Sequence, residues 1–219
     1  MHDGFHPPIE EYLEAICELE EEGVPVIQAR LAERLDHAPP SVSEMIRRLR
    51  DEGFIEMSGR EVQLTPVGRT RAESVVRKHR LAERLLTDVI GLPWHKSHVE
   101  ACRWEHVISD EVEAHLVVLL ENPNTCPHGN PIPGTVPNPG RLTALTDCEI
   151  GARTRLARVT ERVEIDMAAL EYLDTNGFRP GAEATVESRA EDGSLTLKVG
   201  DATLTLDEAL AEQLFVAVE

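Results

Sequence analysis

The chain has 219 residues, of which 41% are hydrophobic and 28% charged. This composition can build an apolar core, and it excludes a disordered or a collagen-like chain. No apolar run approaches the roughly 20 residues that a membrane helix needs, and the first residues lack a basic-then-apolar signal. We therefore expect a soluble cytoplasmic protein with no membrane partner. The four cysteines form no CxxC pair and are too sparse for a disulfide framework, so reduced thiols are expected.

The formal net charge is −18, which argues against a protein that coats nucleic acid nonspecifically. Residues 30–72 are the exception, because they hold eight arginines against seven acidic residues. This segment can still approach phosphate groups. Bound cations are an obvious way to neutralise part of the charge that the rest of the chain carries.

Helical spacing of apolar residues, followed by short β-type runs, predicts three helices and a hairpin, over 9–23, 26–36, 41–53, 54–57 and 61–65. This order is the sequence form of a winged helix-turn-helix. The alternative is a small helical bundle with a stray hairpin. The winged form is favoured because the arginine-bearing helix 41–53 and Arg60, at the hairpin tip, fall within the segment that is not acidic.

A long helix over 67–92 and one or two helices over 94–122 are predicted next. They carry more apolar surface than so few helices can hide, which predicts a helical dimer interface. Residues 122–140 hold six prolines and three glycines and predict a linker or an irregular rigid loop. The short β-type runs after it, with one helix between them, predict a small β-barrel.

Side chains of the kinds that bind metals gather in the middle of the chain. Six of them fall within 28 positions: His79, Glu83, His98, Cys102, Glu105 and His106. Offsets of three and four residues place Cys102, Glu105 and His106 on one face of a helix. His98 precedes Cys102 by about 6 Å along a helix axis, a spacing that favours two neighbouring sites over one crowded site.

Two other interpretations of these residues stay open. A His–Glu pair four residues apart is most often solvated, and a lone helical cysteine usually belongs to the core. In that case the chain is a winged-helix module for protein–protein contact. The run C-R-W-E-H also imitates the H-x-x-E-H motif of zinc peptidases, but cysteine replaces the first histidine, so a zinc-dependent hydrolase is disfavoured and no enzyme is expected.

The residues also carry a family resemblance. RKHRLAERLLTDVIGLPWHKSHVEACRWEHVISDEVE (77–113) closely resembles the diphtheria-toxin-repressor family of iron-dependent and manganese-dependent regulators, and CELEEEGV (17–24), ARLAERLD (29–36) and GNPIPG (129–134) extend the likeness. The resemblance implies a mainly α protein with a C-terminal SH3-like β-barrel. The expected domains are a winged helix-turn-helix DNA-binding domain (1–72), a helical metal-binding and dimerisation domain with a Pro-rich linker (73–140) and the barrel (141–219).

The resemblance also implies two metal sites. The primary site would use Glu11, Cys102, Glu105 and His106. The ancillary site would use His79, Glu83, His98, Glu161 and Glu164. TCPHG (125–129) resembles streptococcal manganese regulators, which makes Cys126 and His128 alternative ancillary ligands.

The expected metal is Mn(II) or Fe(II), with two ions per chain. The iron-type members carry Met where this chain has Glu11, and a hard carboxylate favours Mn(II). Cys102 favours Fe(II) or Zn(II), unless only its backbone carbonyl binds. The balance favours Mn(II), with Fe(II) close behind.

The expected function is metal-activated repression of metal-ion homeostasis genes by a homodimer on double-stranded operator DNA, without a small organic substrate. The start of helix 41–53 would enter the major groove with Pro40, Ser41, Ser43 and Glu44. Guanidinium groups would hold the phosphates through Arg47, Arg48, Arg50 and Arg60.

Overall fold

The computed structural model describes residues 8–136 and 140–218. They divide into two compact units, which are described separately. The N-terminal unit comprises Met1–His79 and Ala101–His115, and the C-terminal unit comprises Arg80–Glu100 and Leu116–Glu219. No helix in the described ranges is both long enough and apolar enough to cross a membrane.

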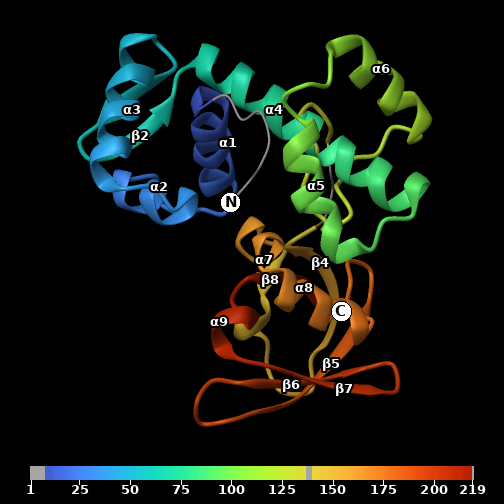
Figure 1. Cartoon of the computed structure of the whole chain (residues 1–219). Coiled ribbons are helices and arrows are strands. Elements are labelled where there is room, and N and C mark those ends of the chain that lie inside the picture. The colour runs from blue at the N-terminus through green and yellow to red at the C-terminus, as the bar shows by residue number, and fades with distance from the viewer. Residues whose placement is uncertain (1–7, 137–139, 219) are drawn as a thin grey trace. The chain divides into compact units, whose positions relative to one another are not determined.

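The N-terminal unit begins with three helices and a hairpin (Figure 1): α1 (Pro8–Glu21), α2 (Gln28–Leu35), α3 (Pro39–Asp51), β1 (Ile55–Ser58) and β2 (Glu61–Leu64). The predicted elements are confirmed, with boundaries that differ by at most two residues. Apolar residues at helical spacing build one core, in which Leu13, Leu31 and Leu49 are fully buried. Burial of these faces fixes the three helices together.

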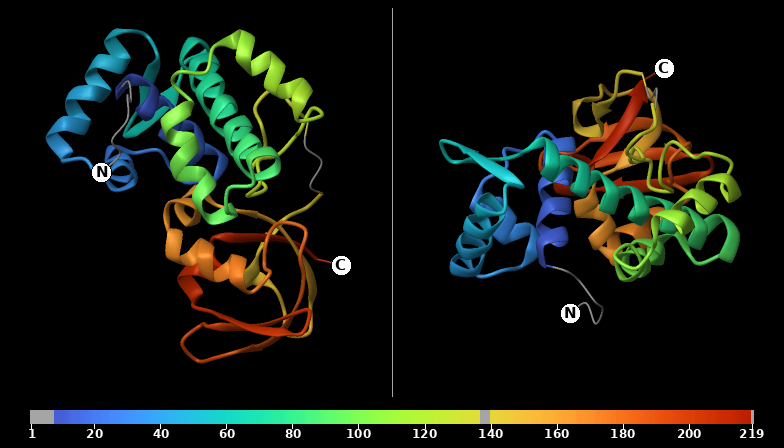
Figure 2. Two further views of the ribbon diagram at one scale, coloured as in Figure 1. Left: turned by 45° about the vertical axis from the view of Figure 1, so that its right-hand side comes forward. Right: turned by 90° about the horizontal axis from the view of Figure 1, so that it is seen from above.

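The hairpin β1–β2 projects from the helices (Figure 2, right). Its strands pair up to Ser58 and Glu61, so the turn consists of Gly59 and Arg60 alone. Gly59 has φ +63°, a conformation that glycine adopts without steric cost. The Val62 amide donates to the Val26 carbonyl at 2.8 Å and attaches the hairpin to the helical core. Arg60 therefore stands exposed at the tip of a wing.

Gly68 lies where α4 (Pro66–Arg84) passes the end of β1, and a Cβ there would stand 1.9 Å from the Phe54 carbonyl oxygen. We expect Gly68→Ala to lower the free energy of unfolding by about 1–3 kcal/mol, because backbone atoms must move to relieve the clash. Urea denaturation measures this difference. Val67→Ala, at an exposed neighbour in the same helix, should change stability by less than about 0.5 kcal/mol. Equal stability of Gly68→Ala and wild type would contradict the close packing.

The middle helices follow the predicted order. After Arg84 the ladder of α4 widens into a π-helical segment, η1 (Leu85–Ile90), where the Thr87 hydroxyl donates to the Glu83 carbonyl at 2.9 Å. The remaining elements are η2 (Trp94–Lys96), α5 (Ser97–Trp104) and α6 (Asp110–Leu119). In the C-terminal unit several large apolar side chains stay exposed, namely Val89, Ile90, Val118 and Leu119. Such a surface is typical of a protein–protein interface.

The rest of the C-terminal unit is a sheet with short helices (Figure 1): β3 (Thr143–Ala144), η3 (Leu145–Asp147), β4 (Arg153–Val159), α7 (Glu161–Ile165), α8 (Met167–Thr175), β5 (Glu183–Arg189), β6 (Leu195–Val199), β7 (Ala202–Leu206), α9 (Glu208–Ala211) and β8 (Leu214–Val218). The strand order is β3-β8-β4-β5-β6-β7. The predicted closed barrel is wrong, because within residues 140–218 the edge strands β3 and β7 do not pair with each other. Strand β3 is only two residues long before η3 begins, which leaves too few backbone groups to close the sheet.

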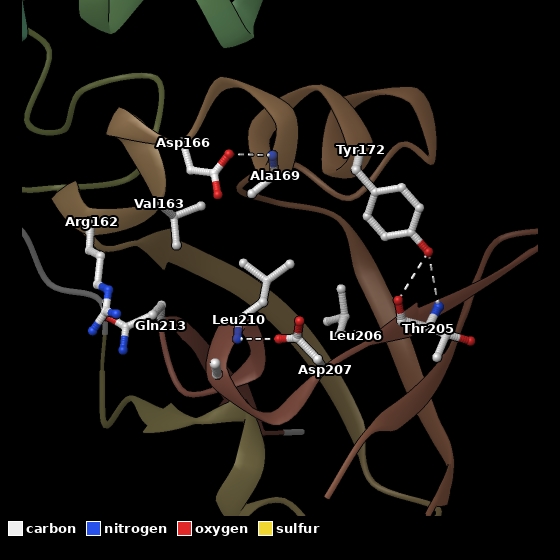
Figure 3. A pocket seen from close by; sticks show the side chains of 11 residues that line it. Arg162, Val163, Asp166, Ala169, Tyr172, Thr205, Leu206, Asp207, Leu210 and Gln213 are labelled. Carbon is white, nitrogen blue, oxygen red and sulfur yellow. Dashed lines mark hydrogen bonds between the residues drawn. The ribbon is translucent and has the colours of Figure 1, made fainter. Parts of the chain in front are cut away.

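A cavity of about 430 Å³ lies among α7, α8, α9 and β7 (Figure 3). Asp166 caps α8 by accepting hydrogen bonds from the Ala168 and Ala169 amides at 3.0 and 3.1 Å. The Tyr172 hydroxyl donates to the Thr205 carbonyl at 3.0 Å. Asp166 and Tyr172 therefore stabilise the local fold around the cavity.

Candidate metal centres

Carboxylate and imidazole side chains meet inside the N-terminal unit. Glu105 lies between two histidines: His79 Nδ1 is 2.5 Å from its Oε2 and His106 Nε2 is 3.0 Å from its Oε1. From α1, Glu10 Oε2 lies 2.9 Å from His106 Nδ1. One helical turn later, Glu14 has a ligand atom within 4.8 Å of those of His79 and Glu105. These five residues are called the first cluster.

The charge balance of the first cluster suits a cation. Burial, followed by the Glu105 and Glu18 carboxylates, raises the pKa of Glu14 well above its usual value. Burial also opposes ionisation of Glu105, but hydrogen bonds from His106 and His79 lower its pKa to about 2. Positive charge on the imidazoles thus balances the carboxylates here. A divalent cation would supply the same positive charge, so the residues fit a metal ion.

A second group of ligand atoms lies in the C-terminal unit. Glu83 on α4, Cys126 and His128 in the proline-rich loop, and Glu164 on α7 are buried, and their ligand atoms lie within 4.8 Å of one another. His128 Nδ1 is 2.8 Å from Glu164 Oε2 and 3.1 Å from Glu83 Oε1. These four residues are called the second cluster. His98 borders it, with Nδ1 3.3 Å from Glu164 Oε2 and 3.4 Å from Glu83 Oε1.

Neighbouring groups hold the carboxylates of the C-terminal unit in place. The Asn130 amide donates to Glu164 Oε1 at 2.5 Å and to the Val159 carbonyl at 2.8 Å. Arg80 donates to Glu161 Oε1 at 3.0 Å, and Glu161 Oε2 lies 3.7 Å from His98 Nδ1. Glu161 and Glu164 therefore each have one oxygen fixed by a donor, while the other oxygen lies near a histidine.

Buried side-chain atoms without a hydrogen bond of normal geometry show that the second cluster also suits a metal ion. Within residues 8–136 and 140–218, both ring nitrogens of His128 and Glu164 Oε2 make no hydrogen bond of normal geometry, although they are buried and close together. Buried polar atoms of this kind need a partner, and a bound cation would satisfy Glu164 Oε2 and one ring nitrogen of His128. A thiol, an imidazole and two carboxylates form a donor set that divalent transition metals accept.

Protons compete with a metal ion for the side chains of the second cluster. Burial, followed by the Glu83 carboxylate, raises the pKa of the Cys126 thiol to about 12. Burial opposes charge on His128, but the Glu164 and Glu83 carboxylates outweigh it and raise the pKa of the imidazole well above its usual value. Both groups hold protons at neutral pH that a metal ion must displace.

Metal affinity of the second cluster should therefore rise with pH. Because the raised pKa values lie above neutrality, log K should increase by about 1–2 per pH unit between pH 6 and pH 8. Titration calorimetry in buffers of different ionisation enthalpy counts the released protons. Cys126→Ser should release about one proton fewer, while Cys148→Ser, at another buried cysteine, should match wild type. Affinity that does not depend on pH would contradict displacement of these protons.

The residues predicted for the primary site lie in the N-terminal unit. Glu105 and His106 adjoin each other in the first cluster. Cys102 lies on α5, half-buried, close enough to Glu14 for its thiol to contribute to the raised pKa of that carboxyl. Glu11 is half-buried on α1, but it belongs to none of the groups of converging ligand atoms found among the described residues.

The carboxylates that α1 contributes to the first cluster were not predicted from the sequence. Glu10 and Glu14 are four residues apart, the spacing that places two side chains on one helix face, and this signal was available. His79 was predicted for the ancillary site, and its Nδ1 lies beside Glu105 in the first cluster.

The other predicted ancillary residues lie together in the C-terminal unit: Glu83, His98, Glu161 and Glu164. The alternative ligands Cys126 and His128 adjoin the same Glu83 and Glu164. Asn130, which fixes Glu164, lies within the GNPIPG run but was assigned no role from the sequence. No local pattern marks an amide for that contact, because its partner is 34 residues away.

The residues predicted to contact DNA lie on α3 and the wing. All are exposed except Ser43, which is half-buried and donates from its hydroxyl to Gln28 Oε1 at 2.8 Å. Arg48 pairs with Glu52 at 2.8 Å and Arg50 with Asp51 at 3.2 Å. Such exposed pairs are weak and leave the guanidinium groups able to exchange partners.

Three family models match consecutive parts of the chain. They are "Iron dependent repressor, N-terminal DNA binding domain" over residues 5–61, "Iron dependent repressor, metal binding and dimerisation domain" over 65–134, and "FeoA domain" over 143–218. The iron-dependent repressor IdeR of Mycobacterium tuberculosis is 45% identical over 214 residues, which cover 92% of this chain and 93% of the relative. The diphtheria toxin repressor of Corynebacterium diphtheriae is 42% identical over the same length, with the same coverage.

Solved structures agree with this match. A manganese-dependent transcriptional repressor in complex with manganese has a TM-score of 0.87 at 30% identity, covering 96% of this chain and all of that one. ScaR with bound Zn²⁺ has a TM-score of 0.80 at 29% identity, covering 96% of this chain and 99% of that one.

A winged helix-turn-helix combined with two buried clusters of metal-ligand side chains defines a metal-responsive DNA-binding protein. The chain belongs to the family of iron-dependent repressors that includes the diphtheria toxin repressor, so the predicted family is confirmed. This is a family of transcriptional repressors, which confirms the expectation of a regulator and removes the hydrolase alternative.

Proposed function

We propose that this protein is a homodimeric repressor of metal-ion homeostasis genes, which binds operator DNA when divalent metal occupies its clusters. The observation that carries the proposal is the first cluster. There Glu10 and Glu14 of α1 meet His79 of α4, and Glu105 and His106 from the turn after α5. A metal ion held by these residues supplies positive charge that several side chains share at once.

The chain's own residues convert that charge into DNA binding. Helix α1 packs in the same apolar core as α2 and α3, so fixing α1 against His79 and Glu105 restricts the helices that present α3 and the wing. Operator affinity rises because the DNA-competent arrangement no longer has to be selected from a broader ensemble. Neutralised carboxylates also lower the repulsion between DNA and a chain of net charge −18.

We propose the ligand sets predicted from the resemblance with two changes. His79, which lies in the first cluster, joins the primary site together with Glu10 and Glu14, and Cys126 and His128 join the ancillary site. The carboxylate-rich first cluster favours Mn(II) or Fe(II), since hard oxygen donors suit these ions. Two of the relatives named above are an iron-dependent and a manganese-dependent repressor. Two clusters in one chain support two ions.

We propose that residues 1–72 bind DNA and that residues 73–140 bind metal and form the dimer. Residues 141–219 form a C-terminal FeoA-type domain. Exposed Val89, Ile90, Val118 and Leu119 support a dimer interface. A protein that acts on operator DNA works in the cytoplasm.

The direct test is selection of DNA by the protein itself. Genomic fragments are incubated anaerobically with metal-free protein and with protein loaded with Mn(II), Fe(II) or Zn(II), and bound fragments are sequenced. We expect a few DNA sites to be enriched only with metal-loaded protein, and Mn(II) or Fe(II) to be the most effective ion. Equal enrichment without metal would favour a winged-helix module that does not sense metals.

Arg60 should contribute to affinity but not to base preference. Arg60→Ala is expected to weaken binding to all sequences alike and to reduce the salt slope of log K by about one, because one phosphate contact is lost. Fluorescence anisotropy on operator and random duplexes at several salt concentrations measures both quantities. Arg153→Ala, an exposed arginine of β4, is the matched control. A changed base preference at unchanged affinity would contradict a phosphate contact.

A further inference from the structure

A second cavity, of about 680 Å³, lies in the C-terminal unit between the proline-rich loop and β4. Three arginines line it, Arg84, Arg155 and Arg158, and every other lining residue is uncharged. The whole chain holds 40 acidic and 22 basic residues, so a wall with three guanidinium groups and no carboxylate departs sharply from its composition. Neither metal cluster nor the DNA-binding surface explains this arrangement.

The walls of the cavity are held rigidly. Arg84 donates from Nε to the Thr125 carbonyl at 2.7 Å and from Nη2 to the Cys126 carbonyl at 3.1 Å. A Cβ on Gly129 would stand 2.0 Å from the Ala157 carbonyl oxygen, so the loop lies directly on β4. A preformed site spares a ligand the cost of ordering the protein around it.

The other two arginines come from β4 and differ in environment. The Arg158 guanidinium lies over the Phe215 ring, 4.6 Å from its centroid, a distance at which cation–π attraction acts. The Arg155 side chain is 50% exposed and pairs with Glu183, which is 68% exposed, at 3.0 Å. Exposed pairs of this kind contribute little, so a multiply charged ligand can displace the carboxylate.

We propose that this cavity binds a small organic anion that bears phosphate or carboxylate groups. Its volume is in the range of small-molecule sites and exceeds what a single inorganic phosphate would fill. Guanidinium forks match the oxygen pairs of phosphates and carboxylates, and more than one fork favours a ligand with more than one charge. The anion is bound and not transformed.

Because the cavity shares a loop with the second cluster, we expect a ligand bound there to affect metal binding. Thr125, Cys126 and Pro127 form part of its wall, and Cys126 also belongs to the second cluster. One short loop thus serves both sites, so negative charge bound against Thr125 and Cys126 changes the metal affinity of the second cluster. By thermodynamic reciprocity, metal there changes the affinity for the anion by the same factor.

The test uses full-length protein freed of metal on a chelating resin and titrated calorimetrically with citrate, inorganic pyrophosphate and glycerol 3-phosphate. We expect at least one of them to bind one per chain with a Kd below about 1 mM, and the arm that binds identifies carboxylate or phosphate chemistry. Arg155→Gln should weaken binding about tenfold, because a charge-assisted hydrogen bond is lost. Arg158→Lys, which keeps the charge but not the fork, should also weaken it.

Arg153→Gln is the matched control, since it removes an exposed arginine of the same strand that does not line the cavity. It should bind the anion as wild type does. Equal weakening by Arg153→Gln, or no binding of any probe at 10 mM (about ten times the expected Kd), would overturn the proposal. So would binding of a random DNA duplex that requires Arg155 and Arg158 without binding of any small anion.

Discussion

Glu105→Gln is expected to abolish the gain in operator affinity that metal gives, while leaving the chain folded. Glu105 places one oxygen beside His79 and the other beside His106. It is therefore the residue that links the two histidines of the first cluster. Allosteric gains of this kind are about 5-fold to 150-fold, and the variant should retain less than about threefold. Anisotropy titrations with and without Mn(II) measure the gain.

The matched control is Glu111→Gln, an exposed carboxylate at the start of α6. It removes the same charge and should keep the full metal response. Circular dichroism establishes that both variants are folded. A normal metal response in Glu105→Gln would exclude the first cluster as the activating site.

The same assay decides which carboxylates of α1 hold the metal. The family resemblance favours Glu11, whereas the distances in the structure favour Glu10 and Glu14. Separate Gln variants at the three positions should therefore differ. Loss confined to Glu11→Gln would support the resemblance, and loss in Glu10→Gln and Glu14→Gln would support the geometry.

Glu164→Gln should remove one of the two metal ions per chain. Glu164 Oε2 lies 2.8 Å from His128 Nδ1, and its partner oxygen is fixed by Asn130, so the carboxylate is central to the second cluster. At a metal concentration of 100 Kd, an intact site stabilises the folded state by about 2.7 kcal/mol, and the variant should lose that increment. Metal analysis after dialysis counts the ions, and thermal unfolding measures the increment.

A point substitution tests this site better than deletion of residues 141–219, because residues 80–100 and 116–219 form one compact unit. Glu171→Gln, exposed on α8, is the matched control and should bind two ions. The Trp94 ring lies 4.9 Å from that of His128, so its fluorescence in a Trp104→Phe background reports on this cluster alone. Two full-affinity ions in Glu164→Gln would rule out the second cluster as a metal site.

Local signals sufficed for most of the fold. Apolar residues three and four apart, with Gly53 and Gly91 near helix ends, predicted the helices to within a few residues of where they occur, since helix boundaries depend on neighbours in sequence. The π-helical turn after Arg84 was not predicted, because its hydrogen bonds shift without any change in apolar spacing. The closed barrel was wrong because closure depends on whether the first and last strands meet, which alternation within each strand cannot show.

The sequence by itself determined the family, the winged helix-turn-helix and the presence of metal-ligand side chains close together in the chain, because motif spacing and helical periodicity are properties of neighbouring residues. The expectation that Cys102, Glu105 and His106 share one helix face was wrong, because α5 ends at Trp104 and Glu105 and His106 lie in the turn that follows. Only the tertiary structure decided which ligands converge. It brought Glu10 to His106 across 96 positions and Asn130 to Glu164 across 34. The tertiary structure also left the sheet open instead of closed into a barrel, and it placed three arginines around one cavity. The physical reason is that coordination and charge act through distances of a few ångströms, and the packing of separate elements alone sets those distances.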